Sequence, residues 1–418
     1  MAQNLTNFDA ALKEFYLPRM RSTINTNRVL MSRLERDATK TDVSGRRAVF
    51  PVNIRPSQAV GARSDEGALP TAQNQTYTEV RVSYKYNYGT IRLSHPTIVA
   101  SRNDKGAFIR VVGSEMSGIR RDLKNDINRQ LFGWGLGSLG TVNGEVAAAA
   151  TTIVMDPGHQ IKVGMVLDSY TSTTCATQDM DGKTVSSVTG NTIVMTAVVG
   201  ATIIDGSYVF RADVANTDAV TAGGYEMMGL MGIVDSAAKN SGIGAFVTTL
   251  QNVARGTYPE WNAQVLEDST PGTSRDITAD LIDEAQLQVM EQAEGECSLG
   301  ITSTTQFRKI GHLLTPERRY GVNQTLEGGF KAIEWAGTPI VWDRDCPVDV
   351  NGNDMMFMLD ESTLAIYELA DWDFDDTDGA ILHRREGYAQ YDAHLYYYAQ
   401  LGCTDPANNL VIRDLSRS

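Results

Sequence analysis

The sequence predicts an α+β protein that carries a small β-rich insertion, and three observations indicate this class. Apolar residues recur three and four apart in some segments, which is typical of helices, and two apart in others, which is typical of strands. Residues 141–213 consist of short β-branched runs separated by turn dipeptides. The 418 residues are enough for about two to three domains.

The composition indicates a soluble globular protein whose main function is not to bind nucleic acid. The chain is 42% hydrophobic and 21% charged, with a net charge of -14, and a strongly acidic chain is a poor ligand for phosphates. The four cysteines form no CxxC pair, which favours a reducing compartment. We expect no signal peptide at residues 1–15 and no membrane span, because both would need a longer apolar run.

The charges are distributed unevenly along the chain. Residues 1–60 carry ten basic and five acidic residues, whereas residues 343–378 carry twelve acidic residues and only Arg344 as a base. Opposite patches of this kind can complement each other between copies of one chain. They can equally be solvated faces that keep the protein soluble, because surface pairs are weak.

The N-terminal segment predicts a short amphipathic helix that ends at Pro18. Its apolar residues fall three and four apart, at Leu5, Phe8, Leu12 and Phe15. A second short helical piece is predicted at 28–36. Since the first apolar face has no evident partner within one chain, we expect it to contact another subunit.

A long hairpin is predicted next. Ala48, Phe50, Val52 and Ile54 alternate with outward residues, a second strand follows at 80–88, and about twenty small or polar residues lie between them. Such a hairpin is marginal alone, so we expect it to lie on a neighbouring copy, with its tip at 61–74 poorly buried in its own chain. No lysine occurs between Arg46 and Tyr84. The candidate intersubunit contacts of the hairpin are its arginines, Arg46, Arg47, Arg55, Arg63 and Arg81.

Residues 103–134 predict one long helix, because Phe108, Val112, Met116 and further apolar residues keep spacings of three and four. A GxGxxG match follows at Gly135, Gly137 and Gly140. A dinucleotide loop requires a strand before these glycines and a helix after them. Here they follow a helix and precede β sequence, so they indicate a helix end.

The remaining elements mix strands and helices. Inside 141–213, strands are predicted at 152–155, 165–170, 183–188, 192–197 and 208–210. An amphipathic helix is predicted at 276–294, then a strand at 297–302 and a helix opened by Ser303 with Gln306 as a capping box. Further strands are predicted at 339–342, 355–359, 364–368 and 388–398.

No catalytic constellation emerges from the sequence, so we expect neither an enzyme nor a cofactor. The acidic run Asp371–Asp378 suggests calcium, but no EF-hand register fits, since Leu382 or Arg384 would occupy the last ligand position. The five histidines are scattered, and His383 and His394 favour a structural interpretation. Cys297 and Cys346 lie in apolar, strand-like surroundings that predict buried thiols.

Several stretches are similar to those of phage capsid proteins: Gly229–Val234, Tyr258–Ala263, and Gly328–Lys331 leading into Ala336–Pro339. The order of the predicted elements also resembles the major capsid proteins of tailed bacteriophages, which have the Hong Kong 97-type capsid fold. The resemblance implies these parts: an N-terminal arm at 1–45, an E-loop hairpin at 46–93, a peripheral domain with the spine helix at 94–140, a β-rich insertion with a small β-barrel at 141–213, a peripheral continuation at 214–275, an axial domain at 276–345, and a return through both sheets at 346–418.

The same resemblance implies a function. It implies self-assembly into hexamers and pentamers that form an icosahedral head around double-stranded DNA, without sequence-specific binding. Scaffolding, portal and decoration proteins are implied partners, and the virion, with the host cytoplasm during assembly, is the implied location. Two alternatives stay open: an encapsulin-like compartment shell, and a metal-dependent β-rich binding protein or enzyme that uses Asp371–Asp378.

Overall fold

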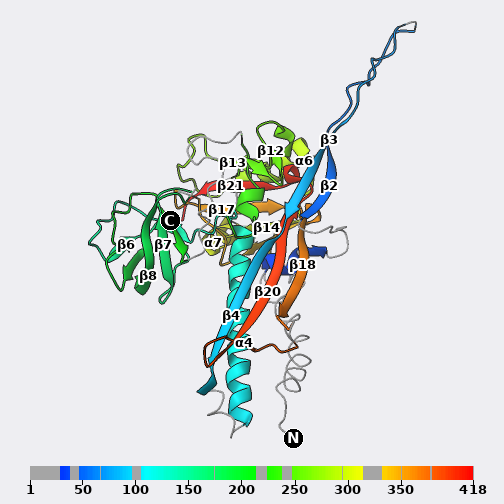
Figure 1. Cartoon of the computed structure of the whole chain (residues 1–418). Coiled ribbons are helices and arrows are strands. Elements are labelled where there is room, and N and C mark those ends of the chain that lie inside the picture. The colour runs from blue at the N-terminus through cyan, green and yellow to red at the C-terminus, as the bar shows by residue number, and fades with distance from the viewer. Residues whose placement is uncertain are drawn as a thin grey trace.

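A computed structural model describes most of the chain (Figure 1). The described residues are 29–37, 47–65, 67–96, 105–173, 175–212, 224–237, 247–293, 295–313, 332–349, 351–376 and 379–417. Five of the predicted intersubunit contact residues therefore lie outside the described part: Leu5, Phe8, Leu12, Phe15 and Arg46. None of the described helices is both long enough and apolar enough to cross a membrane.

A long central sheet lies against the longest helix. Strands β4 (Lys85–Ser94) and β20 (Gln390–Cys403) pair with each other and run along α4 (Lys105–Phe132) (Figure 1). Ile91 and Leu93 of β4 are buried, whereas Tyr86 and Tyr88, on the opposite side of the pleat, are exposed. The sheet and its helix comprise β1 (Glu35–Asp37), β4 (Lys85–Ser94), β18 (Leu364–Phe374), β19 (His383–Arg384), β20 (Gln390–Cys403) and α4 (Lys105–Phe132).

Helix α4 confirms the predicted long helix. Its 28 residues span about 42 Å at 1.5 Å per residue. Met116, Leu123, Ile127 and Leu131 are buried, as the predicted apolar stripe requires. The helix ends at Phe132, and Gly135, Gly137 and Gly140 have positive φ angles, so the GxGxxG match follows a helix end and is not a dinucleotide loop.

A second, six-stranded sheet has the order β13-β21-β17-β14-β16-β15. Two helices, α6 (Ala279–Ala293) and α7 (Thr304–Leu313), share an apolar cluster with one face, and the other face joins the core around Phe132. The predicted cap is half correct. The backbone N–H of Gln306 donates to Ser303 Oγ at 3.3 Å, but the side chain of Gln306 donates to Asp354 instead of completing a capping box. The strands are β13 (Gln264–Leu266), β14 (Leu299–Thr302), β15 (Ile333–Trp335), β16 (Thr338–Trp342), β17 (Asp354–Leu359) and β21 (Leu410–Leu415).

A third sheet within residues 139–212 has its own apolar cluster. Five of its six strands match the predicted positions to within five residues, whereas the strand at 140–141 was not predicted. A bridge from Val142 to Met155 links the ends of the first and last strands of the order. Arg211 Nη2 lies 2.9 Å from Asp126 Oδ1 on α4, which fixes this sheet to the rest of the chain. The strands are β5 (Gly140–Thr141), β10 (Tyr208–Arg211), β7 (Val166–Tyr170), β8 (Gln178–Thr189), β9 (Thr192–Met195) and β6 (Thr152–Val154).

The short helix predicted at 28–36 is present only in part, as α2 (Val29–Arg33), because the chain enters strand β1 at Glu35; α2 lies in the core of its own chain. Val29, Leu30 and Met31 are buried, and Arg33 donates two hydrogen bonds to Glu361, at 2.7 and 2.6 Å. Strand β1 then pairs in parallel with β18. Residues 29–37 are thus part of the folded body, which the sequence alone did not predict.

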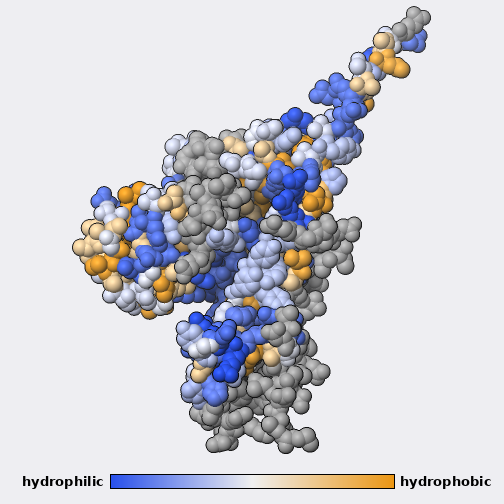
Figure 2. Space-filling model, viewed as in Figure 1, coloured by the Kyte–Doolittle hydropathy of each residue, from blue (hydrophilic) through white to orange (hydrophobic). Residues whose placement is uncertain are grey.

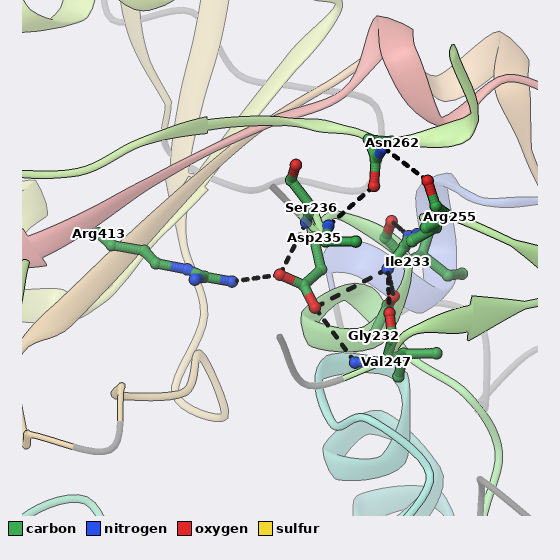
Figure 3. A network of polar contacts seen from close by, with 9 residues as sticks. Gly232, Ile233, Asp235, Ser236, Val247, Arg255, Asn262 and Arg413 are labelled. Carbon is green, nitrogen blue, oxygen red and sulfur yellow. Dashed lines mark hydrogen bonds and ion pairs between the residues drawn. The ribbon is translucent and has the colours of Figure 1, made fainter. Parts of the chain in front are cut away.

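A fully buried charged network connects three distant segments (Figure 3). Asp235 follows α5 (Leu230–Ile233), and its Oδ1 accepts from Arg413 Nη2 of β21 at 2.8 Å. Its Oδ2 lies 3.8 Å from Arg255 Nη1, which donates to the carbonyl oxygens of Gly232 and Val247. All three charged side chains are 0% exposed.

Candidate subunit interface

A two-stranded ribbon projects from the body of the molecule (Figure 1). It consists of β2 (Arg47–Arg55) and β3 (Thr76–Ser83), which among the described strands pair only with each other. The loop at 56–75 joins them at the far end. Val60 and Leu69 in this loop are 83% and 86% exposed, and apolar residues stand among polar ones along it (Figure 2). The predicted tip is therefore poorly covered by its own chain.

The ribbon is shorter than the sequence predicts. The second strand was expected at 80–88, but pairing with β2 ends at Ser83, and from Lys85 onward the chain pairs with β20. Tyr84 separates the two strands and is buried against Tyr367 and Val82. Both strands alternate with the same period of two, so the sequence alone could not reveal the change of partner.

The root of the ribbon rests on its own chain. The ring of Phe50 stacks on that of Tyr367 at 6.3 Å, and Val52 and Ile54 pack against the main core. The Arg81 amide donates to the carbonyl oxygen of Gln251 at 2.9 Å. The expectation that the hairpin lies on a neighbour is thus wrong for the root, because these apolar residues find partners within the chain.

Two of the predicted contact arginines are paired within their own chain. Arg55 Nε donates to Glu260 Oε1 at 2.7 Å, and its guanidinium lies over the ring of Tyr258. Glu260 belongs to η1 (Pro259–Trp261), so this pair holds the outer end of β2 to the body. Arg81 Nε donates to Glu79 Oε1 at 2.9 Å on the same strand.

The other two described arginines leave more of their charge to solvent. Arg63, in the projecting loop, donates to the carbonyl oxygens of Ala62 and Ala68 at 3.0 and 3.1 Å. It is paired with no carboxylate among the described residues. Arg47, at the start of β2, is exposed. The structure therefore brings the predicted arginines into no single cluster, and Arg63 is the one carried farthest along the ribbon.

An acidic groove between β13 and α6 was not predicted. Its hollow has a volume of about 620 Å³, and Leu287 stands in it 63% exposed. A signal was present in the sequence, since Leu287 and Met290 fall outside the apolar stripe of this helix. The groove is lined by four carboxylate side chains and no basic one, with these residues: Val265, Leu266, Asp280, Asp283, Glu284, Leu287, Gln288, Glu291 and Gln292.

A larger hollow of about 820 Å³ lies between α4, the 139–212 sheet and the start of α7. Its walls carry charges of both signs. Arg344 Nε lies 3.0 Å from Asp345 Oδ1, and Arg417 Nε lies 3.3 Å from Asp354 Oδ1. Because these charges neutralise one another across the walls, the hollow favours neither an anion nor a cation.

The residues that suggested a metal or a reactive thiol lie in structural settings. The rings of His383 and His394 stack at 6.5 Å, and their nitrogens contact the Asp375 carbonyl oxygen and the Thr90 hydroxyl. Across the described residues, which omit 377–378, no group of three His, Cys, Asp or Glu is placed to hold a metal ion. Burial raises the pKa of the Cys297 thiol to about 11, which opposes thiolate formation.

Comparisons with known proteins identify the fold. No protein-family model matches the chain, and no curated protein matches its sequence. Among solved structures, a chain of the capsid asymmetric unit of cyanophage A-1(L) is 15% identical, with 92% of this chain and 90% of that chain covered and a TM-score of 0.53. The holo-SrpI encapsulin complex from Synechococcus elongatus is 10% identical, with coverages of 94% and 89% and a TM-score of 0.47. The capsid of cyanophage P-SCSP1u is also 10% identical, with coverages of 94% and 90% and a TM-score of 0.46. The first match confirms the predicted fold class, and this chain has the Hong Kong 97-type capsid fold.

Proposed function

We propose that this protein is the major capsid protein of a tailed double-stranded DNA phage. Copies of the chain assemble into hexamers and pentamers that close into the icosahedral head. The observation that carries the proposal is the match in fold to the capsid chain of cyanophage A-1(L) over about nine tenths of both chains. The ribbon supports it, because a two-stranded element is marginally stable in water and the end that projects beyond the body would gain stability by contacting another molecule.

The role is structural and not catalytic. The partners we propose beyond the protein itself are a scaffolding protein, a portal, a decoration protein and packaged DNA. With a net charge of -14, the chain would enclose the DNA without gripping its phosphates. We also propose that the sheet within 139–212 faces the outside of the particle, since it has a core of its own and stands apart from the central sheet (Figure 1).

Electron microscopy of the purified full-length chain tests this function. Closed particles built of hexamers and pentamers are expected, and a density map would show which side carries the 139–212 sheet. Particles from infected cells that contain this chain should hold double-stranded DNA, whereas an encapsulin-like shell would hold a protein cargo instead. A monodisperse monomer whose melting temperature depends on calcium would contradict the proposal and favour a metal-binding protein.

A further inference from the structure

We propose that the domain at residues 139–212 carries a surface that binds the same surface of a second copy, across the two-fold axes between neighbouring hexamers and pentamers. The inference rests on the proposed function, which supplies the second copy. It assigns a contact to the one part of the chain that the proposed function places only on the outside of the particle.

Two segments of this domain, residues 146–155 and 184–204, contain no aspartate, glutamate, lysine or arginine, although the chain as a whole is 21% charged. The two segments are neighbours in space. Strand β9 pairs with both β6 and β8, and the Val199 amide donates to the Ala150 carbonyl oxygen at 3.0 Å. Their exposed residues therefore form one uncharged surface, which we call the neutral face.

The neutral face exposes apolar side chains that the core of its own domain does not use. Ile153 and Ile193 point into that core and are 0% exposed, whereas Val154, Val198 and Ile204 are 43%, 47% and 46% exposed. Strand β6 lies at the end of the domain that points away from α4 (Figure 1), and pale and orange residues gather there in Figure 2. Covering these side chains would remove apolar surface from water, which favours association.

The contact uses side chains and not a strand edge. Strand β6 pairs with β9 on one side. On its other side, the Asn143 amide donates to the Val154 carbonyl oxygen, and the Asp156 amide donates to the Thr141 carbonyl oxygen, both at 2.9 Å. Because both edges of β6 are already bonded, a partner cannot extend the sheet there, and it must pack on the outward side chains.

The chemistry of the neutral face fits a second copy of itself. The chain has a net charge of -14, so two copies meet with least repulsion where neither presents a charge. A charged partner surface would lose hydration here and gain no ion pair. A surface that contacts itself forms a two-fold symmetric contact, and an icosahedral shell has two-fold axes between its neighbouring hexamers and pentamers.

The size of the neutral face indicates a contact that forms only during assembly. About a dozen of its residues are exposed, whereas a standard interface has roughly 20–30 residues on each side. The face is therefore too small to hold two free subunits together. It adds stability once the ring contacts have brought two copies of the domain side by side.

Single cysteines test the two-fold contact directly. Four variants of the full-length chain, Val154→Cys, Val198→Cys, Ala201→Cys and Ile204→Cys, are assembled separately and oxidised with diamide. At least one should give dimers, and nothing larger, on a non-reducing gel, because only a residue close to a two-fold axis can bond to its own copy. Val163→Cys is the matched control, since Val163 is 62% exposed in the same domain but lines the hollow toward the body.

The outcomes separate the contact from the proposed function. Shells in which none of the four variants gives more dimer than the control overturn the contact and leave the proposed function intact. A wild-type chain that forms no shells contradicts the proposed function, and the contact falls with it.

A mixture of charges provides the second test. Val198→Lys and Val198→Asp should each lower the yield of shells about tenfold, because a two-fold axis brings the two like charges together. The two variants mixed before assembly should give several times the yield of either alone, since a lysine can then face an aspartate. The melting temperature of the unassembled chain should stay unchanged, because Val198 is half exposed. Val163→Lys is the control.

Three results would refute the contact. The first is a pair of charged variants that assemble like the wild type, and the second is a mixture that assembles no better than its components. The third is a density map of native particles in which a different protein covers the neutral face.

Discussion

Asp235→Asn should destabilise the subunit strongly, because it removes the single negative charge from the buried network in Figure 3. The asparagine has nearly the same shape but only one acceptor oxygen, whereas the Ser236 and Val247 amides now donate to different oxygens of Asp235, so one of these two hydrogen bonds would also be lost. It could not neutralise Arg255 and Arg413. Even beside Asp235, burial lowers the pKa of Arg255 to about 10, so the site already disfavours this charge.

The size of the effect follows from the burial. Breaking a buried ion pair by removing one partner costs about 3–5 kcal/mol. An unfolding entropy of about 2.1 cal/mol/K per residue gives roughly 0.9 kcal/mol/K for a chain of 418 residues that unfolds as one unit. The melting temperature should therefore fall by about 3–6 °C.

Thermal unfolding of unassembled subunits, followed by circular dichroism, measures this change. Glu79→Gln is the matched control: it removes one carboxylate from an arginine pair, but the pair with Arg81 is exposed on the ribbon, so the melting temperature should not move. An Asp235→Asn melting temperature within about 1 °C of the wild type, well below the expected shift, would show that the network does not need its negative charge.

Three further predictions concern stability and the shell. Burial raises the pKa of Asp349 to about 6, so the free energy of unfolding falls as pH rises from about 4 to 6 and this carboxyl ionises. Asp349→Asn should therefore raise the free energy of unfolding above pH 6 by up to about 3 kcal/mol. A gain that persists at pH 4 would contradict this cause. Leu30→Ala should cost about 2–5 kcal/mol in denaturant unfolding because Leu30 is 0% exposed, whereas an unchanged midpoint would mean that α2 is dispensable. Shells should dissociate into single chains on a reducing denaturing gel, because the ribbon carries no lysine that could form a covalent link to a neighbour. The first lysine after Arg46 is Lys85, at the start of β4, where it donates to the Gly224 carbonyl oxygen; ladders of covalent multimers would refute this.

The sequence was sufficient where the periodicity of apolar residues decides the structure. The stripe through Met116 and Ile127 predicted α4, and the alternation around Phe50 predicted the first ribbon strand. The sequence was insufficient where two consecutive strands have the same period of two but pair with different partners. Apolar residues keep recurring at every second position on both sides of Tyr84, although the pairing partner changes there from β2 to β20. Only the packing of Tyr84 on Tyr367 therefore marks the boundary between the two strands.

Charged residues were the least predictable part of the candidate interface. Arg55 and Arg63 occur in the same hairpin, yet Arg55 is held by Glu260, 205 positions away, and Arg63 is not. Asp235 and Arg413 are 178 positions apart and fully buried. From a sequence alone, charged residues are expected at the surface, because a charged side chain is buried only when the fold places a partner, often distant in the sequence, beside it.

This distribution of charges suits a subunit that must fold before it assembles. The buried pairs lie in a low dielectric, where salt screens them little, so they hold the body together whether or not other copies are present. Exposed charges, such as the pair of Arg81 with Glu79 on the ribbon, are screened by salt, and each such pair contributes only a few tenths of a kcal/mol. In the proposed shell, many weak contacts repeated around a ring would give a stable particle, while each one could still break. A wrongly placed subunit could then leave without unfolding, which would let a closed shell form from identical chains.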